Sequence, residues 1–467
     1  MKAENIEDIY ELTPLQKGIL FHSLYENESQ LYLFQQLYSV PNLNIDVFEK
    51  AWQLLVDRHT ILRTGFYWEE IENPLQVVYK QVKLPLNQYD WRNLERVEQE
   101  NQLESFIDSD RKLYFDLSQP CLMRLTLIRL TDDYYQFIWS NHFIIVDGWS
   151  DSLILQEFVQ IYEALSKNKE IPLAPTRPFR DYVDWLQQQD ISRTEIFWRQ
   201  ALQGVKTPTP LTYIEKIGQS PTQEERYDEE IIKLSSTSTQ AIESFAIQHR
   251  LTLATILNGI WAILLGRYSR RNDILYGCTV TGRPVDLDGV ESIAGVFVNT
   301  LPIYVNIDIE QPLLSWLQHL QTQLVETRDY EYTPLTEIHG WSEVPRNLTL
   351  FESYVVLENF PISQFVKSWG RGTNLEIKHN KVYYRSNYPL NLVVYPDEEL
   401  LIAFSYDSRR FEIDTIAGIL KDIEILLQQL IINPNLQIKN LPFSTPKQQL
   451  ITSILEKEAL GVELFQI

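Results

Sequence analysis

Residues 142 to 148 read His-Phe-Ile-Ile-Val-Asp-Gly and combine an imidazole, a carboxylate and a glycine that could serve chemistry. His142 ends an apolar run that predicts a strand, and Asp147 and Gly148 follow in a predicted loop. Such loops often carry functional residues, because the rigid strand before them fixes their position. The alternative is a buried histidine followed by an ordinary turn, since turns favour Asp-Gly for backbone reasons. Taken alone, the segment favours this alternative.

The elements that would position these residues can be read from apolar patterns. Two apolar runs separated by residues 131 to 133 predict a hairpin that leads into His142, and a helix is expected over 150 to 165. Strand-like and helical segments alternate in both halves, which predicts an α/β sandwich in each. The three prolines within 167 to 178 mark the best linker candidate. Further helices are expected over 5–25, 47–59, 181–202, 241–268 (two) and 414–432, and strands over 64–78, 122–129, 134–141, 273–279, 298–305, 350–357, 390–395 and 400–406.

Composition narrows the class of protein. A chain of 467 residues is too long for one typical core and favours two or three domains. The net charge of −22 makes nucleic acid and anionic membrane surfaces poor partners. Cys121 and Cys278 are the two cysteines, which fits a reducing compartment and argues against zinc or a disulfide framework. Without an apolar run of 18 residues or an apolar leader, the sequence predicts a cytoplasmic protein with no membrane span.

Six further blocks accompany residues 142 to 148 and span positions 12 to 390. They are Leu12 to Gln16 with Leu20 to Ser23, Arg58 to Phe66, Phe179 to Trp185, Gly295 to Thr300, Asp329 to Leu335, and Tyr384 to Leu390. Together they resemble, in the same order, the motifs of condensation domains from nonribosomal peptide synthetases, in which residues 142 to 148 correspond to the HHxxxDG signature. Seven blocks in order are not a chance match, so the chain is identified as a member of this family over essentially its whole length.

The resemblance implies an α/β fold of two chloramphenicol-acetyltransferase-like lobes, arranged as a V with an active-site tunnel between them. The lobes are expected over residues 1–175 and 176–440, and 441–467 would begin a linker toward an adenylation domain. Donor and acceptor carrier proteins would bring thioesters on phosphopantetheine arms, and the acceptor amine would attack the donor carbonyl to form a peptide bond. The family implies a monomer that itself binds neither metal nor cofactor.

The resemblance also shows where this chain departs from its family. His142 matches the first histidine, but Phe143 stands where the second histidine belongs, and that residue is usually assigned to the chemistry. A neutral imidazole accepts a proton near pH 7 and contributes roughly 10²–10⁴-fold to rate, whereas a phenyl ring has no proton acceptor. An engineered substitution, a naturally inactive domain and a domain that works by positioning are the three explanations. We expect a loss of proton transfer, engineered or natural.

The aspartate and glycine of the motif receive supporting roles. Asp147 is expected to be structural and to pair with an arginine, for which Arg63 is the sequence-based guess. Gly148 would carry the tight turn, and its N–H is a candidate donor to a developing oxyanion, because glycine permits close backbone approach.

Four other positions are candidates for the tunnel. Trp149 and Ser150 follow the motif directly, with a core position favoured for the tryptophan. Asn299 and Arg385 belong to later blocks and would face either the tunnel and its latch or structural hydrogen bonds. No metal ligand set is expected.

Other functions remain open at this stage. A noncatalytic, condensation-like module could dock carrier proteins or recruit a partner enzyme. An epimerisation domain shares the fold and the signature, but the block from Leu12 to Gln16 and the run from Val298 to Thr300 are more similar to condensation domains. Cyclisation domains carry aspartates in place of the histidines, which Phe143 does not match. Met1 lies close to the first block, which suggests the start of a synthetase subunit, and the far end suggests a fragment of a longer enzyme.

Overall fold

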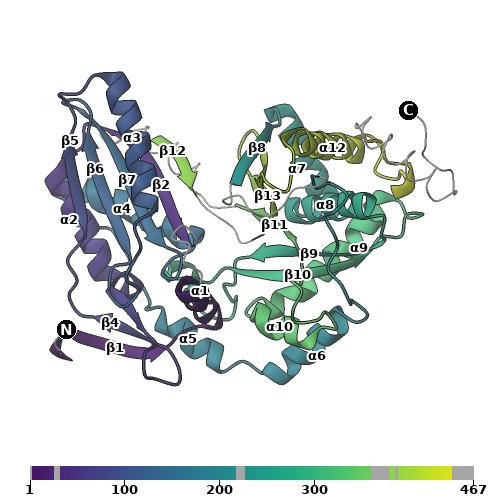
Figure 1. The fold of residues 1–467 in the computed structure, drawn as a ribbon, viewed down its shortest axis with the longest axis horizontal. Coiled ribbons are helices and arrows are strands. Elements are labelled where there is room, and N and C mark those ends of the chain that lie inside the picture. The colour runs from purple at the N-terminus through teal and green to yellow at the C-terminus, as the bar shows by residue number, and fades with distance from the viewer. Residues whose placement is uncertain (1–2, 26–31, 217–226, 359–377, 384–387, 444–467) are drawn as a thin grey trace.

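A computed structural model describes residues 3–25, 32–216, 227–358, 378–383 and 388–443, and it divides into two halves that stand side by side (Figure 1). The N-terminal half contains a five-stranded sheet in the order β12-β2-β7-β6-β5 and a three-stranded sheet in the order β1-β4-β3. Its strands are β1 (Ile6–Glu11), β2 (Leu33–Pro41), β3 (Thr64–Tyr67), β4 (Leu75–Tyr79), β5 (Leu86–Asp90), β6 (Met123–Arg129), β7 (Tyr134–His142) and β12 (Lys378–Tyr383). Its helices are α1 (Pro14–Tyr25), α2 (Ile45–Arg58), α3 (Arg96–Arg111) and α4 (Gly148–Ser166).

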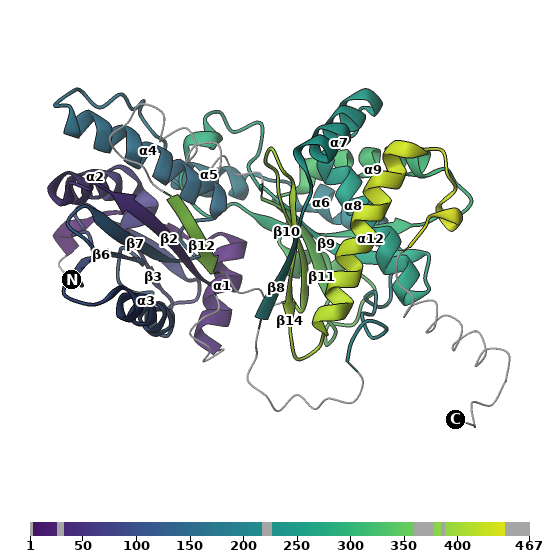
Figure 2. The ribbon, with the colours of Figure 1, turned by 90° about the horizontal axis from the view of Figure 1, so that it is seen from above.

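The C-terminal half is built on a six-stranded sheet in the order β10-β9-β11-β13-β14-β8. The strands are β8 (Tyr227–Lys233), β9 (Asp273–Val280), β10 (Asn299–Asn306), β11 (Ser353–Leu357), β13 (Leu390–Tyr395) and β14 (Leu401–Asp407). Viewed from above, α8, α9 and α12 lie along one face of this sheet (Figure 2). The helices are α5 (Arg180–Gln187), α6 (Ile191–Ala201), α7 (Ser236–His249), α8 (Leu253–Ser269), α9 (Leu313–Glu326), α10 (Leu335–Trp341) and α12 (Ile413–Ile432).

The described residues form four hydrophobic cores, the smallest of which contains Trp91 and Ile107 beside α3. The other three show which side chains share a face of a sheet. The first core lies in the N-terminal half and includes Trp52, Phe137 and Phe158. The second core lies between the six-stranded sheet and α7, α8, α9 and α12, and the third contains Trp198 from α6 and Ile338 from α10 against the other face of that sheet. The α/β architecture predicted from the sequence is therefore confirmed.

Two segments from the later part of the sequence pack with the N-terminal half of the structure. Residues 287 to 297, between β9 and β10, add Leu287, Ile293 and Phe297 to the first core. Strand β12 pairs antiparallel with β2 and forms the edge of the five-stranded sheet, where Figure 2 shows it beside β2. The predicted boundary at residues 175/176 is thus wrong for β12, because its backbone hydrogen bonds lie with the N-terminal sheet.

The elements next to the motif agree with the sequence in type and differ in detail. Strands β6 and β7 pair antiparallel, as the predicted hairpin requires, and α4 begins at Gly148, two residues earlier than expected. The single helix expected over residues 181 to 202 is instead divided into α5 and α6. The break has a local cause, because the Asp190 carboxylate accepts hydrogen bonds from the backbone of Ser192 and Arg193 and so begins a new helix.

At the other end of the chain, Leu441 is buried in the second core, so the linker predicted from residue 441 does not begin there. Residues 444 to 467 lie outside the described part of the structure. Among the described residues, no single helix is both long and apolar enough to cross a bilayer. The pair α7 and α8 meets that test only jointly, and the two helices are bent by 101°.

The segment between β9 and β10 requires a glycine where it turns back. Gly282 has φ +62°, and a Cβ atom there would lie 1.9 Å from the carbonyl oxygen of Phe297. We predict that Gly282→Ala lowers the free energy of unfolding by more than about 2 kcal/mol, through backbone strain and this clash. Denaturant titration would measure the change.

The matched control is Gly204→Ala. Gly204 also has a positive φ, +83°, but nothing lies within 4 Å of the position that an added methyl group would take. That substitution should cost only about 1 kcal/mol, because an L-residue is disfavoured in the left-handed conformation. Equal losses in the two variants would show that the contact with Phe297 contributes nothing.

Candidate active site

His142 is held as a neutral, structural imidazole at the end of β7. It is buried, and its Nδ1 accepts a hydrogen bond from the backbone N–H of Ile144 at 3.1 Å. The ring proton therefore resides on Nε2, which lies 3.5 Å from the hydroxyl oxygen of Ser23. Burial lowers the pKa of His142 to about 3. With one nitrogen accepting and the other protonated, this imidazole has no free lone pair to take a substrate proton.

Phe143 occupies the next position, where its ring packs and its backbone forms a hydrogen bond. Its N–H donates to the carbonyl oxygen of Tyr32 at 2.8 Å, and its half-buried ring packs against the first core. The phenyl ring offers neither a hydrogen-bond donor nor a proton acceptor at the position where the family places its second histidine. The two residues at the start of the motif therefore supply no base.

Asp147 connects the start of α4 to the segment before β10. One carboxylate oxygen caps α4 by accepting from the backbone N–H of Ser150 at 2.8 Å. The other accepts from the N–H groups of Phe297 at 2.9 Å and Val298 at 3.2 Å. The side chain is 2% exposed, and these three bonds replace the water that an ionised carboxylate would lose on burial. Asp147 thus holds the two halves together.

The predicted pairing of Asp147 with Arg63 is wrong. Arg63 lies at the end of a short helical turn, where it donates to the carbonyl oxygen of Val56 at 3.0 Å and pairs with Glu7 at 2.6 Å. The arginine beside Asp147 is Arg283, whose guanidinium nitrogen lies 3.7 Å from the carboxylate. Residues 281 to 284 read Thr-Gly-Arg-Pro, which indicates a turn, but nothing in this segment indicates that Arg283 meets Asp147.

Ser150 belongs to the same network and not to a tunnel wall. It is fully buried, and its hydroxyl donates to the carbonyl oxygen of Gly295 at 2.6 Å while accepting from the N–H of Gly295 and from Arg283, each at 3.0 Å. The predicted substrate contact of Ser150 is therefore corrected to a structural role. We call Asp147, Ser150, Arg283 and the backbone of residues 295 to 298 the Asp147 network.

The remaining candidates are placed as follows. Trp149 is half-buried, its indole N–H lies 3.4 Å from the carbonyl oxygen of Glu291, and Arg283 stands over its ring. Asn299 donates its amide to the carbonyl oxygens of Glu331 and Thr333, which is the structural alternative of the prediction. Gly148 is the first residue of α4, and its oxyanion role stays a prediction. Arg385 lies outside the described residues.

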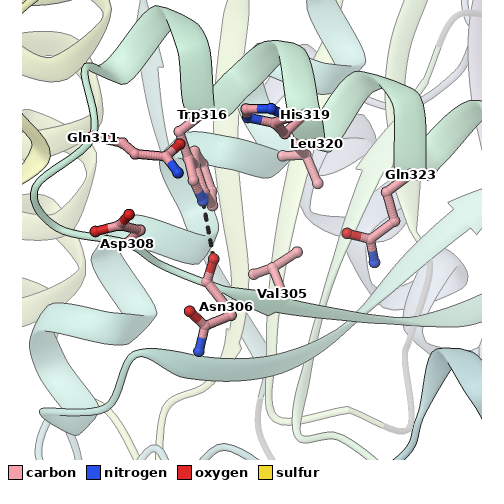
Figure 3. A pocket seen from close by; sticks show the side chains of 8 residues that line it. All are labelled: Val305, Asn306, Asp308, Gln311, Trp316, His319, Leu320 and Gln323. Carbon is pink, nitrogen blue, oxygen red and sulfur yellow. Dashed lines mark hydrogen bonds between the residues drawn. The ribbon is translucent and has the colours of Figure 1, made fainter.

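A pocket of about 380 Å³ lies away from the motif, between β10 and α9 (Figure 3). Trp316 and Gln323 from α9 donate to the carbonyl oxygens of Asn306 and Tyr304, and so bind the free side of the edge strand β10. Asn306 and Asn299 are at opposite ends of β10, about 23 Å apart for an extended strand. Within the described residues no group of three His, Cys, Asp or Glu side chains could hold a metal ion.

Comparison with known proteins identifies the family. A family model for the condensation domain matches residues 6–451. The chain belongs to the condensation domain family. Peptide-bond formation is the general function of this family in nonribosomal peptide synthetases. The Asp147 network joins two of the sequence blocks on which the resemblance was based, residues 142–148 and residues 295–300.

Curated relatives of this condensation domain are subunits of peptide synthetases. It is 41% identical over 437 residues to a subunit of linear gramicidin synthase from Brevibacillus parabrevis, covering 93% of this chain and 6% of that subunit. It is 30% identical over 456 residues to surfactin synthase subunit 3 of Bacillus subtilis, covering 97% of this chain and 35% of that relative. The chain thus spans a small part of these relatives.

Solved structures share the fold at lower identity. A four-domain nonribosomal peptide synthetase bound to AMP and glycine matches with a TM-score of 0.79 at 18% identity, over 95% of this chain and 34% of that one. The X-domain from teicoplanin biosynthesis matches with a TM-score of 0.77 at 19% identity, over 95% of this chain and 99% of that one. These matches show that the condensation domain has the two-lobed fold predicted from its motifs.

Because Asp147 pairs with Arg283, substitutions at these two positions should have non-additive effects on the free energy of unfolding. Asp147→Asn combined with Arg283→Met should show a coupling energy of about 1 kcal/mol or more, because each single change leaves a buried group without its counter-charge. Asp147→Asn combined with Arg63→Met should be additive within about 0.5 kcal/mol, since their partners differ. Chemical denaturation of the five variants measures both cycles. A coupling energy between Asp147 and Arg63, with none between Asp147 and Arg283, would contradict the observed pairing.

The buried His142 predicts a pH dependence of stability. Its pKa of about 3 in the folded protein lies below the value near 6.5 of an exposed imidazole, so the unfolded chain binds the extra proton between these two pH values. The contribution of His142 to stability is therefore fully present above about pH 6.5 and is lost as the pH falls toward 3. Imidazole ¹⁵N spectra should show a neutral ring protonated at Nε2 at pH 5, and a charged ring would refute this.

Proposed function

We propose that this chain joins a donor acyl or peptidyl thioester to the amine of an acceptor aminoacyl thioester, both on carrier proteins, and that Phe143 slows the reaction. One observation carries the proposal. The Asp147 network that fixes the motif between the two halves is complete, while the side chain at position 143 has lost its proton acceptor. The relatives that are synthetase subunits support the reaction class.

The chemistry explains the expected slowing. As the C–N bond forms and the C–S bond breaks, the attacking nitrogen must lose protons. Phe143 cannot accept one, and His142 already uses Nδ1 as an acceptor and Nε2 as a donor. Orientation of the two thioesters in a tunnel between the halves can still supply several kcal/mol. The N–H of Gly148 remains a candidate donor to the developing oxyanion.

The wider setting is part of the same proposal. Upstream and downstream carrier proteins bring the substrates on phosphopantetheine arms, and an adenylation domain adjoins this domain in the synthetase. The chain passes from the first lobe to the second near residue 175, with β12 returning to the first, and the domain works as a monomer in the cytoplasm and uses no cofactor of its own. Relatives of much greater length than this chain support a place in a multidomain enzyme.

A noncatalytic docking module is the second candidate. The X-domain of teicoplanin biosynthesis, solved in complex with OxyB, matches with a TM-score of 0.75 at 19% identity over 95% of this chain and 97% of that one. That complex shows that this fold can bind another protein. In this chain, the specific observation in favour of such a role is Phe143.

Substitution of Phe143 by histidine tests both candidates. If only proton transfer is impaired, Phe143→His should raise the rate of dipeptide formation between loaded carrier proteins by about 10²-fold, the lower end of a general-base contribution. Quenched-flow single turnovers with mass-spectrometric detection would measure the rate. Carrier affinity should stay within twofold.

The control is Phe143→Leu, which keeps an apolar side chain without a proton acceptor and should stay near the original rate. An equal gain in both variants would show that size and not proton transfer limits the reaction. Absence of product in every variant, with carriers still bound, would favour the docking module.

A further inference from the structure

One carboxyl group stands at the end of the six-stranded sheet that meets the N-terminal half. In the observed register, Asn299 of β10 lies opposite Val280 of β9, and Leu357 of β11 lies opposite Val394 of β13. Strands β11 and β9 pair at Tyr354 and Val355, and this register continued by two residues brings Leu357 and Val280 onto one row. Val298 precedes β10 and Glu358 follows β11, so the same register continued by one more residue brings both onto the next row, two strand spacings apart. Two spacings correspond to about 10 Å. Because the N–H of Val298 donates to Asp147, Glu358 lies on the same row as a member of that network.

Strand alternation shows which way the side chain points. Val355 and Leu357 of β11 belong to the second core, whereas Val356 belongs to the third. Glu358 therefore continues the face of Val356, since alternate residues of a strand share a face. On β13, Tyr395 continues the face of Val393 in the same manner and lies on the row of Glu358. The two side chains are neighbours across the sheet.

Glu358 is half-buried, and its neighbour Tyr395 is 36% exposed. Burial raises the pKa of the Glu358 carboxyl to about 7, and the carboxylate of Asp147 adds to the increase. Burial also raises the pKa of Tyr395, to which Glu358 and Glu229 contribute. Among the described residues, no hydrogen bond or ion pair of the Glu358 side chain is formed, and its backbone N–H donates to Val394. Within this part of the chain the carboxylate is thus an unpaired acceptor.

We propose that Glu358 accepts the proton of the acceptor amine in this chain, in place of the imidazole that is lost at position 143. The inference rests on the proposed function and concerns the same site. Three observations meet at Glu358: a carboxylate unpaired among the described residues, a place on the row that ends at the Asp147 network, and a motif whose own residues offer no base. A negative charge at this place also attracts the ammonium form of the substrate.

The proton balance of the step is complete. The acceptor ammonium gives one proton to the Glu358 carboxylate, and the neutral amine attacks the thioester carbonyl. When the tetrahedral intermediate collapses, the C–S bond breaks and the second proton of the nitrogen passes to the departing thiolate. The products are an amide and a thiol, and Glu358 releases its proton to water. A carboxyl with a pKa near 7 suits an amine whose own pKa is about 8.

Glu358→Gln tests the proposal, alone and combined with Phe143→His. In the original chain, Glu358→Gln should lower the single-turnover rate of dipeptide formation at least tenfold, with carrier affinity and melting temperature little changed. In the Phe143→His background the same substitution should lower the rate less than threefold, because the imidazole takes the proton. The control is Glu398→Gln, which changes an exposed glutamate in the turn between β13 and β14 and should have no effect.

Each other outcome overturns the inference. A rate for Glu358→Gln within threefold of the original shows that the carboxylate is not the acceptor. An equal loss in both backgrounds shows a role unrelated to position 143. If only chains with Phe143→His form product, Glu358 does not replace the imidazole, while the proposed function stands. If no variant forms product, the proposed function fails as well.

A second variant covers the case in which the glutamine variant does not fold. Glu358→Asp keeps the charge and withdraws the carboxylate by one methylene group. Its rate should fall at least threefold in the original chain and recover with Phe143→His. An unchanged rate, in a variant whose circular dichroism matches that of the original, would overturn the proposal.

Discussion

The hydrogen bonds of one buried carboxylate determine how the two halves of this condensation domain meet. Asp147 caps α4 and at the same time binds the backbone that leads into β10. A buried charge is costly unless it is fully bonded, so the position of each element constrains the other. Arg283 adds a counter-charge from the loop after β9, and Ser150 bonds to both Arg283 and Gly295. Asp147 of the motif and Ser150 therefore have a structural role, which is to hold the two halves together.

This constraint separates the roles of neighbouring motif residues. His142 and Asp147 are both committed to hydrogen bonds inside the protein, which explains why their retention alone does not preserve a base. Phe143 lies between them, and its ring has a footprint similar to that of an imidazole but lacks the nitrogen atoms. An acyl-transfer site of this kind depends on two separable properties. The Asp147 network fixes the geometry of the motif. The proton acceptor depends on single side chains beside this network, such as the one at position 143.

The sequence was informative where the interactions are local. The hairpin of β6 and β7 could be predicted from alternation and turn residues, and α4 was expected, although it begins at Gly148, two residues before the predicted start. The helix break at Asp190 also had a local signal, a capping residue, which a pattern of apolar positions alone does not detect. Arg283 and Glu358 could not be predicted in this way. Their significance comes from loops and strands that meet only in the folded chain.

The pairing of β12 with β2 has a consequence for how such domains can be exchanged between synthetases. A strand from late in the sequence completes the sheet that carries the histidine motif, and residues 287 to 297 fill the same core. A cut near residue 175 would leave β2 with an open edge and an incomplete core, which promotes aggregation. Recombination within this domain would join strands and loops that were not selected together. The smallest unit that can be transplanted as a folded piece is therefore the pair of lobes.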